Sequence, residues 1–288
     1  MVTSSFDYYA PTSVADALAL LDQHGDDAKL LAGGHSLIPL MKTRLAEPAV
    51  LIDLGKISTL SYINEQDGGL AIGAMTTYSE IAGSELVQSN APVLAEASGQ
   101  VADNQIRNRG TIGGSLSHSD PAGDLPAVAL ALGAQLTTSS SGAHRTISAD
   151  DFFVDLLTTA LEPNEILSEI VIPALPAGTG TAYAKFANKA SHYAVVGVAA
   201  VVTVGSDGTC QSARIGITGA GPKATRATGT ESALVGSNLD DSAVRAAASH
   251  AGDGIDFNED VHASGEYRAH LISVYAARAI RAAVENAT

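Results

Sequence analysis

The sequence predicts an α+β protein made of three consecutive units, which span residues 1–57, 58–175 and 176–288. A chain of 288 residues has room for more than one domain, at roughly 100–200 residues per domain. The stretch 173–178 is rich in Pro and Gly, which is typical of a linker. Beyond it, three apolar runs precede three helical patterns, so the last unit is predicted to be an antiparallel sheet covered by helices.

The first unit is predicted to combine one helix with two strands. Between Ser13, which suits an N-cap, and Gly25, which suits a helix stop, apolar residues recur at helical spacing. This pattern predicts an amphipathic helix. Apolar runs at 29–31 and 49–54 predict two strands, and the first of them leads directly into paired glycines.

The second unit is predicted to mix short helices with strands. Its predicted elements are, in order, a strand at 70–73, helices at 77–81 and 92–101, a strand at 127–137 that runs into a Ser-rich hairpin at 139–142, and a strand at 165–173.

The third unit is predicted to hold three antiparallel strands, at 182–187, 194–204 and 213–218, with a hairpin turn at 205–208. Helices follow at 224–235 and 240–251, and a last one places apolar residues on one face from Ile272 onward. The apolar run at 194–205 is too short for a membrane span, which needs about 20 residues. We therefore expect a buried strand there and no transmembrane segment.

Composition excludes several classes of protein. With 16 Lys+Arg against 31 Asp+Glu, the net charge of −15 offers no basic surface for nucleic acid. The single cysteine, Cys210, cannot build an iron–sulfur cluster or a structural zinc site. The N-terminal residues 1–7 lack the pattern of a secretory signal, so we expect a cytoplasmic protein.

Two Gly-Gly motifs carry the strongest chemical signal. They are Ala32-Gly33-Gly34-His35-Ser36 and Thr111-Ile112-Gly113-Gly114-Ser115. Paired glycines let successive backbone N–H groups point at one anion, and two such nests would suit a diphosphate. The alternative is that each pair simply makes a tight turn.

Four further polar residues have open interpretations. Arg107 and Arg109 precede the second motif and would either neutralise a diphosphate or lie in solvent or at a domain interface. Asp124 would accept hydrogen bonds from a ligand's hydroxyls or serve as a turn residue. Lys185 lies on an apolar strand, and a buried amine there needs a partner. We expect no metal site.

With their flanks, Leu37 to Pro39 and Asp120 to Pro126, these motifs resemble the FAD-binding medium subunit of molybdenum hydroxylases, the family that includes aerobic carbon monoxide dehydrogenase and xanthine dehydrogenase. The resemblance covers essentially the whole chain. It implies a two-subdomain FAD-binding fold of the vanillyl-alcohol-oxidase (PCMH) type, followed by a C-terminal α+β domain of the carbon monoxide dehydrogenase flavoprotein type.

The resemblance also implies the residues that bind FAD. The two loops would hold the pyrophosphate, and other positions would contact the adenine, the ribityl chain and the flavin ring. In that order the residues are Ala32, Gly33, Gly34, His35, Ser36 and Leu37; Thr111, Ile112, Gly113, Gly114 and Ser115; Val101 and Ala102; Asp124; Leu167; Lys185 at the polar edge of the ring; and Tyr193 where the C-terminal domain approaches it. The chain departs from the commoner family residues at His35, Ser115 and Lys189.

As a member of this family, the chain would be the FAD-carrying electron-transfer subunit of a heterotrimeric oxidoreductase. FAD would bind non-covalently, and molybdopterin and [2Fe–2S] clusters would lie on a large and a small partner subunit. Electrons would reach FAD from the clusters and leave to an acceptor such as a quinone or oxygen. The resemblance further implies a dimer of heterotrimers and a cytoplasmic location, including the inner face of the membrane.

Two other functions remain open from the sequence. The chain would be a self-sufficient FAD-dependent oxidase or dehydrogenase of related fold, or a non-catalytic nucleotide-binding assembly module. Direct reduction by a substrate would favour the first of these, and absence of flavin binding would favour the second.

Overall fold

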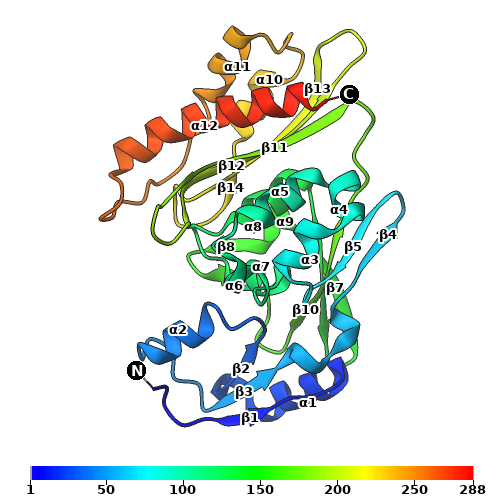
Figure 1. Ribbon diagram of the computed structural model, residues 1–288, viewed down its shortest axis with the longest axis vertical. Helices are drawn as coiled ribbons and strands as arrows, with labels where there is room; N and C mark the ends of the chain where they lie inside the picture. Colours follow the sequence, from blue (N-terminus) through cyan, green and yellow to red (C-terminus); the bar gives the residue numbers. More distant parts are fainter. Residues whose placement is uncertain (1, 288) are drawn as a thin grey trace.

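The computed structural model describes residues 2–287 and arranges them in three tiers, each built around its own sheet (Figure 1). The N-terminal tier and the long C-terminal helix lie at opposite ends of the molecule, with the five-stranded sheet between them. Sheets and helices occur in every tier, so the predicted α+β class is confirmed. The unit boundaries at 57/58 and 175/176 stay a prediction.

The first tier is a three-stranded parallel sheet in the order β1-β3-β2. Its α1 helix follows the predicted pattern, because the Ser13 hydroxyl accepts from the Asp16 N–H and the helix ends at Gly25, whose φ is 51°. Strand β1 was not predicted, because three residues at a sheet edge are too few to give an alternating pattern. The elements are β1 (Asp7–Tyr9), α1 (Val14–His24), β2 (Ala28–Leu31), α2 (Leu37–Lys42) and β3 (Val50–Asp53).

The second tier is a five-stranded antiparallel sheet in the order β4-β5-β10-β6-β7, covered by helices. A two-stranded ribbon, β8-β9, extends from it. The strands are β4 (Ile63–Gln66), β5 (Gly69–Gly73), β6 (Gln135–Ser140), β7 (Ala143–Ser148), β8 (Phe153–Asp155), β9 (Thr158–Thr159) and β10 (Ile166–Ile172). The helices are α3 (Tyr78–Gly83), α4 (Glu85–Asn90), α5 (Pro92–Gln100), α6 (Asn104–Arg107), α7 (Ile112–His118), α8 (Asp124–Leu132) and α9 (Ala149–Phe152).

One predicted strand of this tier, at 127–137, was wrong. The residues from Asp124 to Leu132 form helix α8, which ends at Gly133 with φ 64°, and strand β6 begins only at Gln135. Every residue of α8 is buried, because the helix lies between the second and third tiers. A helix buried on all sides has no polar face, and its sequence therefore cannot be distinguished by periodicity from a buried strand.

The third tier is an antiparallel sheet in the order β11-β12-β13-β14. The three long strands confirm the prediction, and β14 adds a two-residue fourth strand. Helices α10 and α12 cover one face, α11 packs on these two helices, and α8 of the second tier packs on the other face of the sheet (Figure 1). The elements are β11 (Thr179–Ala187), β12 (Ala194–Val204), β13 (Cys210–Thr218), β14 (Thr225–Arg226), α10 (Thr228–Leu234), α11 (Asp241–Ala248) and α12 (Gly265–Glu285).

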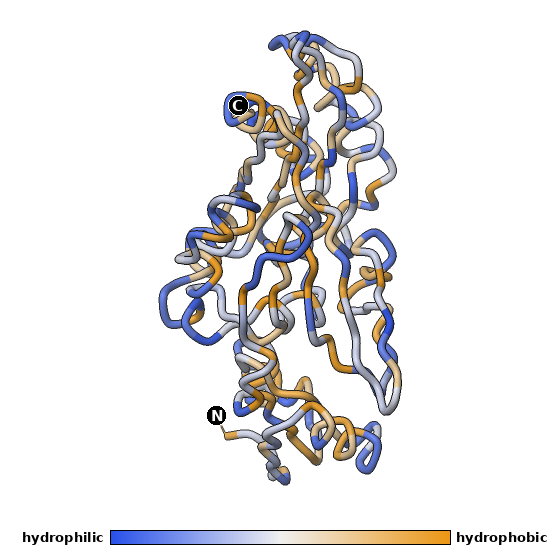
Figure 2. Tube along the Cα trace, turned by 90° about the vertical axis from the view of Figure 1, so that its right-hand side faces the viewer, coloured by the Kyte–Doolittle hydropathy of each residue, from blue (hydrophilic) through white to orange (hydrophobic). Residues whose placement is uncertain are grey.

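Close helix–sheet packing joins the second and third tiers. A Cβ atom on Gly216 of β13 would lie 2.0 Å from the Ala127 carbonyl oxygen of α8, so only glycine permits this approach. The core of the second tier also includes Tyr183 and Val201 of the third-tier sheet. Figure 2 shows hydrophobic stretches following the central strands and hydrophilic stretches in outer loops. The two tiers therefore share apolar contacts that fix their relative position.

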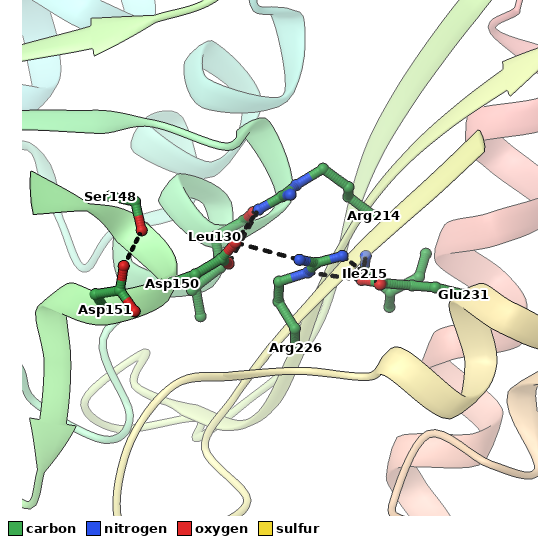
Figure 3. Close-up of polar contacts among 8 residues, drawn as sticks. All are labelled: Leu130, Ser148, Asp150, Asp151, Arg214, Ile215, Arg226 and Glu231. Carbon is green, nitrogen blue, oxygen red and sulfur yellow. Dashed lines mark hydrogen bonds and ion pairs between the residues drawn. The ribbon is translucent and has the colours of Figure 1, made fainter.

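A polar cluster reinforces this junction (Figure 3). Arg214 of β13 donates from Nε and Nη2 to the Leu130 carbonyl oxygen, at 3.1 and 2.8 Å, near the end of α8. Arg214 and Arg226 also bind the two oxygens of Asp150, at 3.0 and 3.2 Å. Glu231 accepts from Arg226 and, at 2.8 Å, from the Ile215 N–H. The third tier is thus attached to the second by two arginines that share one carboxylate.

Within residues 2–287, no helix combines the length and the hydrophobicity that crossing a lipid bilayer requires.

Candidate functional site

A cavity of about 560 Å³, the main cavity, is lined by all three tiers. Its size lies in the usual range for small-molecule and cofactor sites. The first tier contributes the loop after β2, and the second contributes α7, the ribbon β8-β9 and β10. The third tier contributes the loop at 191–193 before β12. Residues remote in sequence therefore meet around one space.

The first glycine motif presents free backbone donors to the main cavity. Strand β2 ends at Leu31 and helix α2 begins at Leu37, and the loop between them lines the cavity. Within the described residues, the N–H groups from Gly33 to Leu37 donate to no other residue. Gly34 has φ 78°, a conformation that favours glycine. This loop has the properties predicted for an anion nest.

The two motifs also contact one another directly. A Cβ atom on Gly33 would lie 2.2 Å from the Arg109 carbonyl oxygen and 2.7 Å from the Gly110 Cα. The Ala32 Cβ lies 3.5 Å from the position that a Cβ on Gly114 would take. Glycine at position 33 therefore lets the first loop lie directly on the segment that leads into the second motif.

The second glycine motif differs from the predicted nest. It forms the first turn of helix α7, with Thr111 as N-cap, and its amides already have partners. The Gly113 N–H donates to the Ala74 carbonyl oxygen at 2.8 Å, and the Gly114 N–H donates to Thr111 Oγ1 at 3.1 Å. The Ser115 N–H donates to the Thr111 carbonyl oxygen at 3.0 Å. The second motif therefore lines the cavity with N–H groups that are already hydrogen-bonded, whereas the first loop lines it with N–H groups that are not.

Arg107 lies outside the cavity and binds the backbone of two residues that line it. Its Nη1 donates to the carbonyl oxygens of Val101 and Ala102, at 2.7 and 2.9 Å. Ala102 has φ 41°, which a non-glycine residue adopts only when its surroundings hold it. Arg107 and the exposed Arg109 are both absent from the cavity lining. The structure thus shows Arg107 holding the turn that contains Val101 and Ala102.

Asp124 is the buried carboxylate of the cavity wall, at the first residue of α8. Its Oδ1 accepts from the Tyr183 hydroxyl at 2.5 Å, and its Oδ2 accepts from Lys185 Nζ at 2.9 Å. Burial raises the pKa of Asp124 above the usual value, while Lys185 and Tyr183 act in the opposite direction. Burial also raises the pKa of Tyr183, so its hydroxyl keeps its proton and remains a donor.

All the predicted site residues except two line the main cavity. The exceptions are Ile112, which is buried in the second-tier core, and Lys185, which lies behind Asp124. Leu167 reaches the cavity from a bulge in β10, and Tyr193 does so from the loop before β12. The departures His35 and Ser115 both line the cavity, whereas Lys189 does not.

A smaller cavity of about 280 Å³ adjoins the main one, and Asp120, Ser191 and Tyr193 line both. His118 Nε2 lies 4.0 Å from Asp120 Oδ2. Among the described residues, no group of three or more His, Cys, Asp or Glu side chains is placed to hold a metal ion.

Sequence reasoning missed several parts of the lining. Glu165 lies directly before β10, and a hydrogen bond from Arg145 lowers its pKa. Tyr78 is the first residue of α3. Burial raises the pKa of Tyr78 to about 12. The ribbon residues Leu157 and Thr159 also line the cavity. No local motif marks these positions, because only the folding of α3, β8-β9 and β10 brings them together.

Comparison with known proteins gives matches along nearly the whole chain. Residues 4–175 match the FAD binding domain in molybdopterin dehydrogenase, and residues 181–283 match the carbon monoxide dehydrogenase flavoprotein C-terminal domain. The chain is 42% identical to the carbon monoxide dehydrogenase medium chain of Hydrogenophaga pseudoflava, over 98% of each chain. It is 40% identical to the 6-hydroxypseudooxynicotine dehydrogenase complex subunit alpha of Paenarthrobacter nicotinovorans, over 100% of this chain and 97% of that one.

A solved structure of carbon monoxide dehydrogenase from Hydrogenophaga pseudoflava matches with a TM-score of 0.97 and 43% identity, over 100% of both chains. The predicted resemblance and the predicted fold are therefore confirmed. These matches show that the chain belongs to the FAD-binding medium subunits of the molybdopterin dehydrogenases, with the C-terminal domain of the carbon monoxide dehydrogenase flavoproteins.

Proposed function

We propose that this chain binds FAD non-covalently in the main cavity and transfers electrons as the medium subunit of a molybdenum hydroxylase. The observation that carries the proposal is the first glycine loop, where successive N–H groups from Gly33 to Leu37 have no partner within the described residues and line the cavity. Backbone amides arranged in this way favour an anionic group such as the FAD diphosphate.

The charge of the cavity supports a site based on backbone donors. The acidic side chains of the lining are Asp120, Asp124, Glu162 and Glu165, against a single lysine, Lys29. Such a wall repels a free anion unless local donors compensate. The N–H groups of the first loop provide that compensation at one place and leave the acidic groups to accept hydrogen bonds from hydroxyl or amide donors of the ligand.

Bound FAD would accept electrons singly and release them in pairs, which joins one-electron carriers to a two-electron acceptor. Cys210 is the chain's only cysteine, so the one-electron carriers would lie on a partner. We infer a small subunit with [2Fe–2S] clusters, a large subunit with molybdopterin, and an external acceptor such as a quinone or oxygen. Assembly as a dimer of heterotrimers is part of the same proposal.

Two measurements test this function. The full chain, freed of flavin, is titrated with FAD while flavin fluorescence is followed, and saturation at one FAD per chain is expected. The tagged chain is then purified from its native host, and we expect molybdenum, iron and two further subunits in the same complex.

Other outcomes identify the alternatives. A chain that binds FAD, is purified alone and is reduced directly by an organic substrate would be a self-sufficient dehydrogenase or oxidase. A chain that remains free of FAD at saturating concentration would be an assembly module. Either result would contradict the proposed electron-transfer function.

A further inference from the structure

Two buried residues of strand β11 connect the C-terminal tier to Asp124, which lines the main cavity. Tyr183 and Lys185 are two residues apart, so their side chains point to the same side of the sheet. Both donate to Asp124, the hydroxyl at 2.5 Å and the ammonium at 2.9 Å, and Lys185 Nζ also donates to the Gln100 carbonyl oxygen at 3.2 Å. Exposure of the Lys185 side chain is 2% and that of Asp124 is 6%.

The placement of these groups separates their roles. Asp124 lines the main cavity, whereas Tyr183 and Lys185 do not. Of the residues whose side chains bind both donors, Asp124 is therefore the one that a ligand in the cavity meets. Because each carboxylate oxygen receives one of these hydrogen bonds, and one donor is charged, the pair favours the ionised form of Asp124. An ionised carboxylate only accepts hydrogen bonds, whereas its protonated form also donates.

We propose that Tyr183 and Lys185 are positioning residues that hold Asp124 as a carboxylate, so that the C-terminal tier sets the charge of the FAD site. The inference rests on the proposed function, in which the main cavity binds FAD. The ionised Asp124 would then accept a hydrogen bond from an O–H or N–H donor of the cofactor. Lys185 also binds the last turn of α5, directly before the cavity residues Val101 and Ala102.

The surroundings of Asp124 favour its protonated form, and the two donors oppose this effect. Burial and the nearby Asp120 both favour the protonated acid. Tyr78 of α3 and Tyr193 of the loop before β12 face the same group as neutral phenols. Glu96 of α5 binds Tyr183, whose backbone N–H donates to its carboxylate at 2.9 Å. Tyr183 and Lys185 are the donors that oppose protonation.

The test is the pH dependence of FAD binding by the full chain, measured from about pH 5 to 9. Protonation of Asp124 should weaken binding on the acid side. In Tyr183→Phe the inflection should move upward by about one pH unit, as expected from the loss of one hydrogen bond to a charged group. Lys185→Gln should move it further, and Lys185→Arg should restore much of the wild-type profile.

Tyr62→Phe is the matched control. Its hydroxyl also donates to a carboxylate, Glu169, at 2.6 Å, but neither residue lines the main cavity. This variant should keep the wild-type pH profile, whatever its effect on stability.

The outcomes distinguish the inference from the proposed function. A dissociation constant that changes equally at every pH in Tyr183→Phe and Lys185→Gln would overturn the inference and leave only a structural role. If Tyr183→Phe does not fold, the comparison of Lys185→Gln with Lys185→Arg decides in the same way. A wild-type chain that binds no FAD would overturn the proposed function itself and the inference with it.

Discussion

Gly33 lies so close to Arg109 that a Cβ atom on the glycine would be 2.2 Å from the arginine carbonyl oxygen. The contact joins the first-tier loop, whose N–H groups are free, to the segment that precedes α7. Carbon and oxygen cannot approach this closely without a bond, so any side chain at position 33 must separate the two segments. The geometry of the proposed diphosphate site depends on this single approach.

We therefore predict that Gly33→Ala weakens FAD binding by at least about tenfold, which corresponds to ~1.4 kcal/mol. The matched control is Gly83→Ala at the exposed end of α3, where a Cβ would meet nothing within 4 Å. Alanine there should leave FAD binding unchanged. Fluorescence titration of both variants checks the prediction, and equal affinities would show that the loop tolerates displacement.

The carboxylate of Asp150, which two arginines share between the second and third tiers, should stabilise the folded protein. Asp150 binds Arg214 and Arg226, whereas the carboxylate of its neighbour Asp151 accepts one hydrogen bond within residues 2–287, from Ser148 at 2.8 Å (Figure 3). Because these groups are partly exposed, we expect Asp150→Asn to cost about 1 kcal/mol. The melting temperature should fall by about 2–4 °C, and that of Asp151→Asn by less than about 1 °C. Calorimetry that gives the same value for both variants would contradict this role.

The pair Arg145–Glu165 should make stability depend on pH. Arg145 Nε donates to Glu165 Oε1 at 2.6 Å, and this hydrogen bond lowers the pKa of Glu165 below its ordinary value. A carboxyl group whose folded pKa is lowered contributes stability above its unfolded pKa, and the contribution disappears as the pH falls through the folded pKa. Arg145→Gln should therefore lower the urea midpoint at pH 7, and the difference from wild type should close below about pH 4.5.

The control for this pair is Arg245→Gln. Arg245 pairs with Asp241 on the surface of α11, with exposures of 64% and 56%. Such exposed pairs contribute little to stability. The urea midpoint of Arg245→Gln should equal that of the wild type at each pH. If its midpoint were instead lower at pH 7 and equal to the wild type below about pH 4.5, the pH dependence could not be attributed to Glu165.

Cys210 should be unreactive in the folded protein. It is 1% exposed, and burial raises the pKa of its thiol. Since the thiolate is the reactive form, a buried thiol with a raised pKa reacts slowly. A thiol reagent such as DTNB should label none of the native protein and one group per chain in denaturant. Rapid labelling of the native protein would show that the start of β13 opens easily.

Much of the fold was predictable where local patterns are unambiguous. Helix α1 has a cap, a regular apolar stripe and a glycine stop, and strands β11, β12 and β13 are long apolar runs separated by turn residues. The prediction failed at α8, whose residues are all buried, because a helix without a polar face has no helical periodicity. Strand β1 was also not predicted, because its three residues are too few to show a pattern and its position depends on pairing with β3.

The sequence by itself determined the family and the positions of the two paired-glycine motifs, because both motifs are local patterns of residues. The lone Cys210 is equally a property of composition. Only the tertiary structure decided which backbone N–H groups remain without a partner, since those of the second motif donate to Ala74 and Thr111. It also placed Lys185 behind Asp124, because burial and hydrogen-bond partners depend on segments that are remote in sequence.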